Sequence, residues 1–467
     1  MTLDELMQLI ATGTGEAKDI IAALKTRPFD IPVWAGEKGL EAQYNPLKHP
    51  VMTDPSYHDI VNDDGTVEHV TKIVVDLQRL AAKRMTELCT GIPVSRVYSP
   101  EDDQQKLVSK YLEKIYDRVR INSVNVQRFN MLFAGCEVMT LWYAVEEENY
   151  LYGFKSPLKL RCRNFSPMLG DELYPMFDEY GDMTAMSVAY RRKVGRRYVN
   201  FFDAYSSTRH VKFSTLNGAW EVVEDDQITL LKIPCIYMWR PKPIWEDNNN
   251  IVYEIEWMLS RNGNYLRKNS KPLFVVFADD VIQFGLEQNE KEEFRSVEQF
   301  PKNSSAQYVT WQQATESLKF QCDTLRSMYF TLLQLPDWSY EKMSQIALSG
   351  ESRKQLFIDA KMKVGDEKGR LLEFLDRETN VIKSFLKVMT GGSMNEAIDA
   401  LPCENKVTPF TINDDAEKAN ALLTANGNKP IMSQRESIEE YGHSNDVDKT
   451  LEEIKAESQI DVFEPTV

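Results

Sequence analysis

The stretch from Pro336 to Met389 constrains this chain most, because a loop there leads into an unusually long helical pattern. A helix from Ser352 to Val388 would be about 55 Å long at 1.5 Å per residue. A compact domain of ordinary size does not need a rod of that length. From Leu371 on, apolar residues recur at the three- and four-residue spacing of one buried helical face: Leu371, Phe374, Leu375, Ile382, Phe385, Leu386 and Met389.

Two glycines, Gly365 and Gly369, lie one turn apart inside this pattern. Each costs about 1 kcal/mol relative to alanine in a helix interior. We therefore predict that they mark a kink or a close contact with another helix.

The composition indicates a folded protein. Its 467 residues, 42% of them hydrophobic, suffice for two to four structural regions. The sequence has no window of about eighteen apolar residues, and its first residues are acidic where a signal peptide would be basic. We therefore expect neither export nor a membrane span, and a chain made and used in the cytoplasm. Six cysteines stand singly without a CxxC pair, which predicts reduced thiols.

Catalytic signatures are missing from the sequence. It contains no phosphate-binding loop, dinucleotide glycine motif, zincin motif or hydrolase elbow. Four Asp-Asp pairs could supply a two-metal site, but each falls at a predicted turn or helix start, where aspartate is common as a cap. His49, His58 and His69 lie in a predicted loop and hairpin, where surface or turn histidines are favoured over a metal site. We predict no enzyme activity, no metal and no cofactor. The pairs are Asp63-Asp64, Asp102-Asp103, Asp279-Asp280 and Asp414-Asp415.

The net charge of −16 argues against a chain whose main task is to grip nucleic acid, although it allows nucleic acid to pass without adhering. The densest basic patch is Arg191-Arg192-Lys193 with Arg196-Arg197, between Tyr190 and Tyr198. It could be a hairpin that presents cations and aromatic rings to nucleic acid. A solvated hairpin tip, or a salt-bridging surface to an acidic neighbour in an assembly, is the favoured interpretation given the overall acidity.

The first half of the chain predicts an α+β domain. It opens with two short amphipathic helices and a proline-rich arm, followed by a hairpin around residues 62–70 and three longer helices. Short alternating runs with Gly, Asn and Asp turns then indicate antiparallel strands up to Trp239. The helices are predicted at Val74–Leu88, Gln105–Arg120 and Asn125–Ala134. The strands are predicted at Glu137–Val145, Leu158–Arg163, Met186–Tyr190, Tyr198–Tyr205, His210–Phe213 and Trp220–Val223.

The second half predicts a stalk with a tip. Val252, Ile255, Leu259 and Leu266 share a face of a helix that starts at Ile251, and a second periodic helix runs from Trp311 to Pro336. Between them lie predicted strands at Leu273–Ala278, Val281–Leu286 and Ala306–Thr310 and a charged helix at Glu290–Phe300. A tail with a short helix at Ala416–Thr424 and a final acidic helix follows.

Several stretches, in this order, resemble the portal proteins of tailed double-stranded DNA bacteriophages of the siphophage type. After Ser349-Gly350 this chain has Glu351-Ser352-Arg353 where the family tends to have small or apolar residues. The similar stretches are the helix ending in Gly-Ile-Pro (Val74–Val94), the sheet segment with Tyr-Pro-Met-Phe-Asp (Phe165–Arg192), the loop and Ser-Gly helix start LPDWSYEKMSQIALSGESRKQLF, and the tail Lys429–Ser458.

The resemblance implies a ring-forming α+β portal fold. Its parts would be a wing at 1–250, stem helices at 251–268 and 311–333, an α/β clip at 269–310, a tunnel loop at 334–348, a long wing helix at 349–390 and a helical crown at 391–467. Trp338, Ser339, Tyr340, Lys342 and Gln345 would be the tunnel-loop residues, with the helix kink at Gly365 and Gly369.

The resemblance also implies partners and a place. The chain would form a ring with itself, twelve-membered in the virion, and would pass double-stranded DNA non-specifically. It would meet the terminase large subunit, a head-tail connector and the major capsid protein at one capsid vertex, after assembly in the host cytoplasm. A metal-dependent enzyme acting on nucleic acid and a non-portal scaffold protein are the alternatives.

Overall fold

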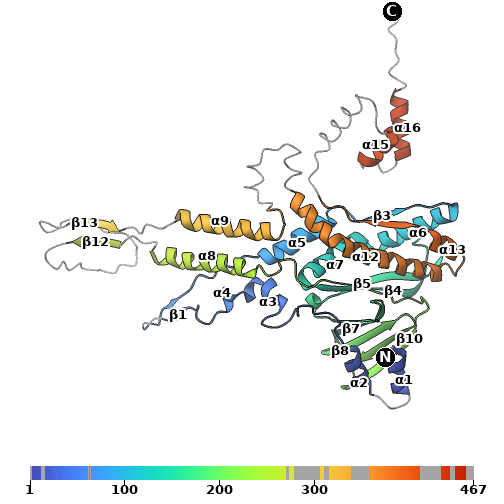
Figure 1. Cartoon of the computed structure of the whole chain (residues 1–467), viewed down its shortest axis with the longest axis horizontal. Helices are drawn as coiled ribbons and strands as arrows, with labels where there is room; N and C mark the ends of the chain where they lie inside the picture. The colour runs from blue at the N-terminus through green and yellow to red at the C-terminus, as the bar shows by residue number, and fades with distance from the viewer. Residues whose placement is uncertain are drawn as a thin grey trace, which may run out of the picture. The chain divides into compact units, whose positions relative to one another are not determined.

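The computed structural model describes residues 3–11, 16–61, 63, 65–269, 273–277, 305–309, 315–337, 357–410, 433–441 and 447–458. By their contacts the residues divide into two compact units. One comprises Met1–Asp337 and Asp359–Phe410, and the other comprises Trp338–Ile358 and Thr411–Val467. The first unit mixes helices with antiparallel sheets, which confirms the predicted α+β class (Figure 1).

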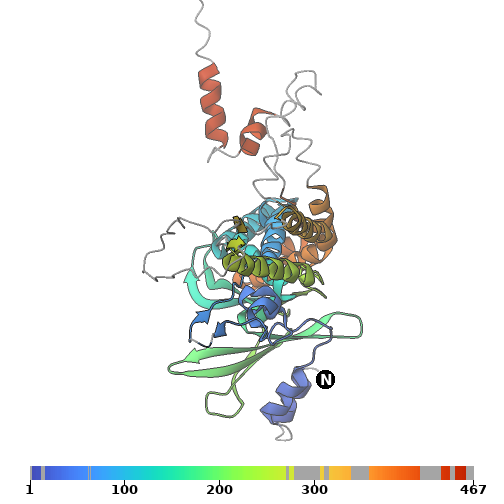
Figure 2. The same cartoon turned by 90° about the vertical axis from the view of Figure 1, so that its left-hand side faces the viewer.

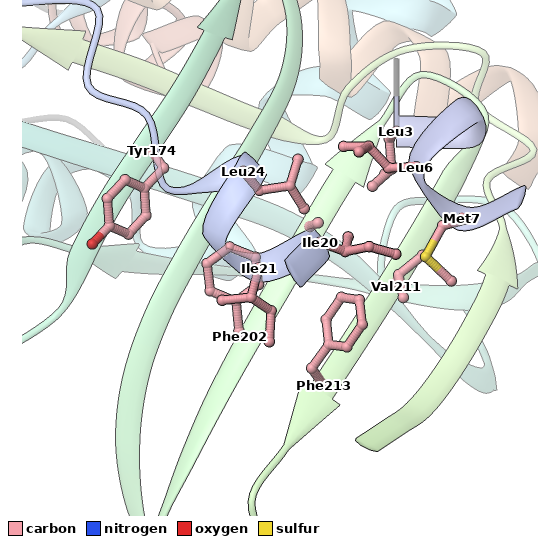
Figure 3. Packing of buried hydrophobic residues seen from close by; sticks show 11 residues of the cluster. Leu3, Leu6, Met7, Ile20, Ile21, Leu24, Tyr174, Phe202, Val211 and Phe213 are labelled. Atoms are coloured by element: carbon pink, nitrogen blue, oxygen red, sulfur yellow. The ribbon is translucent and has the colours of Figure 1, made fainter. Parts of the chain in front are cut away.

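A five-stranded antiparallel sheet has the order β10-β9-β8-β7-β6. Helices α1 (Leu3–Ala11) and α2 (Ala17–Leu24), both predicted, cover one of its faces (Figure 3). The strands are β6 (Glu172–Phe177), β7 (Met183–Val194), β8 (Arg197–Ser206), β9 (Arg209–Ser214) and β10 (Glu221–Gln227). The core between helices and sheet comprises Leu3, Leu6, Met7, Ile20, Ile21, Leu24, Tyr174, Phe202, Ala204, Val211 and Phe213.

A second, three-stranded sheet packs on the other face of the first. Its order is β11-β4-β5, so the predicted strands divide between two sheets. Residues that alternate along β4 and β7 meet in a shared core, because side chains two apart on a strand share a face. The strands are β4 (Glu137–Asn149), β5 (Ser156–Phe165) and β11 (Cys235–Trp239). This core comprises Met139, Leu141, Phe165, Leu173, Met186, Val188, Tyr190, Tyr205, Cys235 and Tyr237.

Helices cover the opposite face of the three-stranded sheet. All the apolar residues predicted for the buried face of the long helix from Leu371 on are buried. That helix, α12, runs over Ile358–Met389, while its predicted start at Ser352 lies outside the described residues. The others are α5 (Leu77–Thr90), α6 (Asp103–Val119) and α7 (Ile121–Gly135).

The two predicted stem helices are α8 (Asn249–Asn269) and α9 (Thr315–Leu332), which run side by side in both views (Figures 1 and 2). In chain order, β12 (Leu273–Phe277) and β13 (Ser305–Val309) lie between them and pair antiparallel. The strand predicted at Val281–Leu286 and the helix predicted at Glu290–Phe300 lie outside the described residues.

Short elements complete the chain. Strand β14 (Cys403–Lys406) pairs with β3 (Ser95–Tyr98) of the first unit. The boundary between the two units therefore falls at Phe410, beyond the predicted start of the crown at Gly391. The helix predicted at Ala416–Thr424 lies outside the described residues. Across the described residues, no helix combines the length and apolar character that crossing a membrane requires. The remaining elements are α3 (Leu40–Tyr44), η1 (Pro46–Lys48), α4 (Pro50–Thr53), the hairpin β1 (Ile60–Val61) with β2 (Val67–Glu68), η2 (Pro167–Leu169), α13 (Asn395–Ala400), α15 (Gln434–Tyr441) and α16 (Val447–Ser458).

Candidate functional site

The predicted tunnel-loop residues Trp338, Ser339, Tyr340, Lys342 and Gln345 all lie outside the described residues. What the structure describes is the chain on either side of them. These flanking residues show how the ends of the segment are held.

Asp337, the last described residue before the segment, is fixed by two arginines. Arg326 on α9 donates from Nη2 to Asp337 Oδ1 at 3.2 Å, and Arg84 Nη2 on α5 lies 3.5 Å from the same oxygen. Arg84 also donates from Nη1 to the carbonyl of Pro336 at 2.8 Å and lies over the Phe330 ring. Burial lowers the pKa of the Arg84 guanidinium, and the nearby Asp337 carboxylate opposes that shift. A charge-assisted clamp therefore holds the start of the segment.

On the other side of the segment, the first turns of α12 are tied to the β11–α8 connection. Lys363 donates to Glu246 Oε1 at 2.9 Å. One turn later, Glu367 accepts from Arg240 at 2.8 Å and from Arg370 at 3.2 Å. The start of the predicted loop at 334–348 and the first turns of α12, beyond its predicted end, are thus attached to the first unit by buried or half-buried ion pairs.

Further along α12, Glu378 is fully buried and holds the helix to the domain. Arg128 of α7 donates to both Glu378 carboxylate oxygens at 2.5 and 2.8 Å, and Trp142 Nε1 of β4 donates at 3.1 Å. Arg96 lies 3.5 Å away. Burial opposes ionisation of Glu378, but the Arg128 and Arg96 charges and these hydrogen bonds keep its pKa below the usual range.

Sequence reasoning missed Glu378, although a signal existed. Glu378 stands on the apolar face of α12, between Leu375 and Ile382 at helical spacing. A carboxylate in an apolar stripe predicts a buried partner of opposite charge, because an unpaired buried charge is too costly.

Helix α8 carries a polar ladder that holds the extended segment before α5. Glu256, Ser260 and Asn264 are spaced four apart and accept from the backbone N–H groups of Val75, Ile73 and Thr71, at 2.9, 2.8 and 2.5 Å. The predicted helix start at Val74 is therefore wrong, and α5 starts at Leu77. The α8 side chains bond alternate N–H groups of residues 71–75 and so hold this segment extended along α8.

His49, which the sequence predicted to be a surface or turn histidine, instead contacts Glu256 of the same ladder. His49 is fully buried: its Nδ1 lies 2.7 Å from Glu256 Oε1 and its Nε2 lies 2.8 Å from the Gln43 carbonyl oxygen. His69, by contrast, is an exposed surface histidine beside Asp59, just after β2, as predicted. The arm that contains His49 is thus attached to α8.

Gly365 and Gly369 lie on the exposed side of α12. A Cβ added at either position meets no described atom within 4 Å, so within the described residues neither glycine makes a close helix contact. The kink stays a prediction.

One further group of potential ligands was missed. His210, Glu224 and Asp226 bring one ligand atom each within 4.8 Å of one another on neighbouring strands. Lys212 already pairs with Glu224 at 2.8 Å, so we assign no metal to this group. All six cysteines are free thiols, as predicted.

Apolar side chains stand exposed along one face of α9. Phe320, Met328 and Leu332 are 73%, 47% and 54% exposed, at spacings of eight and four residues. On α8, Leu266 is 48% exposed, although its apolar periodicity predicted a buried face. These side chains lack cover from the described part of the chain.

The residues of this site position helices and loop ends through ion pairs and hydrogen bonds. Such an arrangement is typical of a structural subunit. The comparison with protein families specifies which one. Residues 40–462 match the family of the phage portal protein, SPP1 Gp6-like, and the chain belongs to that family of structural, non-enzymatic virion proteins. The resemblance seen in the sequence is thereby confirmed.

The comparison with solved structures finds chains from gene transfer agent (GTA) particles. A chain in the virion of a native GTA particle is 10% identical, with a TM-score of 0.37, and the match covers 90% of this chain and 96% of that one. A chain in the neck of an empty GTA particle is 9% identical, with a TM-score of 0.40 and coverage of 89% and 96%. No curated protein matches the sequence.

Proposed function

We propose that this chain forms the ring-shaped channel at one capsid vertex, through which double-stranded DNA is packaged and later ejected. The exposed apolar face of α9 carries this proposal. Phe320, Met328 and Leu332 would be covered by a neighbouring subunit, because a heterologous contact repeated around an axis closes into a ring. The ring is twelve-membered in the virion.

Charge supports DNA passage through such a ring. Each subunit has a net charge of −16, so a ring of them repels the phosphate backbone over most of its surface. Duplex DNA would then slide with little adhesion. The chain would dock the terminase large subunit and, later, a head-tail connector at its clip, and would anchor in the shell of the major capsid protein.

The test of ring formation uses a charge-matched pair of variants. Phe320→Glu with Met328→Glu adds two negative charges on the exposed apolar face of α9. Lys319→Glu changes the charge by the same amount on another face of that helix. Native mass spectrometry and electron microscopy should find rings for the wild type and for Lys319→Glu, and smaller species for the double variant.

A wild-type protein that stays a monodisperse monomer would contradict the proposal. Rings that survive the double variant would show that another surface closes them. Magnesium-dependent cleavage of DNA that is lost on substituting one Asp pair would favour the enzyme alternative instead.

A further inference from the structure

We propose that the tip of the β7–β8 hairpin is a second contact for duplex DNA, outside any tunnel. This inference depends on the proposed function in one respect, that a portal works beside packaged duplex DNA. The tip comprises residues 190–200 and contains Arg191, Arg192, Lys193, Arg196 and Arg197.

The tip is a two-stranded ribbon that extends past the rest of its sheet. Strand β6 pairs with β7 only as far as Ala189, and β9 pairs with β8 only from Phe201. Beyond these points β7 and β8 continue as a pair, from Arg191 opposite Asn200 to Val194 opposite Arg197, and Asn200 at the base of the ribbon still bonds to Thr215. Gly195 closes the turn with a φ of 62°.

The ribbon concentrates positive charge on an acidic chain. Its five cations are all exposed, and residues 190–200 contain no carboxylate. Tyr198 and Tyr190 lie beneath the Arg191 and Arg192 guanidiniums, at 4.8 and 4.7 Å from the ring centroids. Among the described residues, none of the five forms an ion pair with a carboxylate. Four of the five are arginines, whose planar guanidinium suits phosphate oxygens.

The two faces of the ribbon are both basic. Arg191 and Lys193 alternate along β7 and share one face with Tyr198, while Arg192 and Arg197 share the other. A flat acidic protein surface would engage one face only. The major groove of B-DNA admits a two-stranded β-ribbon and has a phosphate backbone on each side. Cations on both faces therefore fit a groove better than a flat partner.

The acidic edge strand β10 is the alternative partner, on a second copy of the chain. Three of its four carboxylates, all except Asp226, have partners within their own subunit: Asp225 pairs with Arg209 at 2.7 Å and Glu224 with Lys212 at 2.8 Å. Glu221 accepts from Asn217. The observations thus favour DNA over a subunit contact.

The test measures binding of the full chain to a covalently closed circle of duplex DNA, which cannot thread a preassembled ring. The double variant Arg191→Glu with Arg192→Glu should make the affinity less dependent on salt. Each lost phosphate contact lowers the slope of log affinity against log salt concentration by about 0.9. Losing two contacts weakens binding about 60-fold at 0.1 M salt. Arg191→Lys with Arg192→Lys keeps the charge and should keep most of the slope.

Lys110→Glu with Lys114→Glu is the control, because both lysines are exposed on α6 and the charge change is the same. It should bind the circle like the wild type.

Equal affinities for the wild type and the Arg→Glu pair, or equal losses in both pairs, would overturn the inference. So would a loss of ring assembly with unchanged DNA binding, which would assign the ribbon to a subunit contact. Rings that do not bind circular DNA would overturn this inference and leave the portal proposal intact. A protein that binds circular DNA but forms no rings would overturn the portal proposal and leave this inference intact.

Discussion

At the scale of single residues, Glu378 shows how one buried charge fixes an element. It joins α12 to α7 and β4 through Arg128 and Trp142. Buried ion pairs of this kind specify position more reliably than they add stability, because desolvation offsets much of the attraction. Removing one partner is costly, since the other charge stays buried and unpaired.

We expect Glu378→Gln to destabilise the protein by about 3–5 kcal/mol, because Arg128 loses its counter-charge in the core. Glu373→Gln on the same helix removes an exposed pair with Arg377 and should cost less than about 1 kcal/mol. Urea unfolding of both variants measures the difference. Equal effects would show that the buried pair contributes no more than the exposed one.

Asp171 makes a pH-dependent prediction. Burial raises its pKa to about 6 from an ordinary 3.8, against a 3.2 Å hydrogen bond from the Ser166 N–H. The folded state therefore favours the protonated form, so the contribution of Asp171 to stability is fully present below about pH 4 and is lost as pH rises through about 6.

Asp171→Asn should remove this loss of stability with rising pH. The variant should gain on the order of 1–3 kcal/mol over the wild type at pH 7.5. The difference should grow between about pH 4 and pH 7 and then stay level. Unfolding curves across this range measure it, and a difference that does not change with pH would contradict the assigned pKa.

At the scale of elements, the α8 ladder decides where α5 begins. The backbone N–H groups of residues 71, 73 and 75 bond to side chains on α8 nearly two hundred positions away in sequence. Each such bond contributes about 1 kcal/mol net. Together they hold residues 71–75 extended along α8, so α5 begins only after this segment, at Leu77.

Replacing Ser260 with alanine should free this segment locally. The N–H of Ile73 loses its acceptor, so hydrogen exchange at Ile73 should become faster while exchange in the β7–β8 sheet stays unchanged. Unchanged protection at Ile73 would contradict the role of the ladder.

Gly365 and Gly369 give a second prediction at this scale. Both are exposed in α12 with open space around the position of a Cβ, so Gly365→Ala with Gly369→Ala should stabilise the helix by about 1 kcal/mol per site. If a kink there serves DNA passage, the more stable variant should assemble normally and package less DNA. A destabilised variant would show that the glycines are needed for packing.

At the scale of the whole molecule, the clamps around Asp337 and Glu367 flank a segment that contains most of the tunnel loop predicted at 334–348. Replacing Trp338 or Lys342 should leave ring assembly intact and impair DNA packaging, because the clamps that hold the flanking chain do not use either side chain. Ring counts by electron microscopy and a packaging assay measure the two effects. Equal packaging by the variants would show that these side chains are dispensable.

Much of the fold could be predicted from periodicity. The paired helices α1 and α2, the antiparallel strands and the buried face of α12 follow from spacings of three, four and two residues, which are local properties of the chain. The order of similar stretches also led to the portal family, which the family match confirms over residues 40–462. The candidate site could be predicted only as a position in the chain.

The sequence by itself thus determined the kinds of elements, their order and the family, because these depend on residues close together in the chain. Only the tertiary structure decided that His49 is buried against Glu256, that α5 starts after the α8 ladder, and that the basic residues near Tyr190 project as a ribbon. These outcomes depend on partners remote in sequence, such as the 250 positions between Arg128 and Glu378. Local pattern carries no information about which remote group will meet a given backbone or charge.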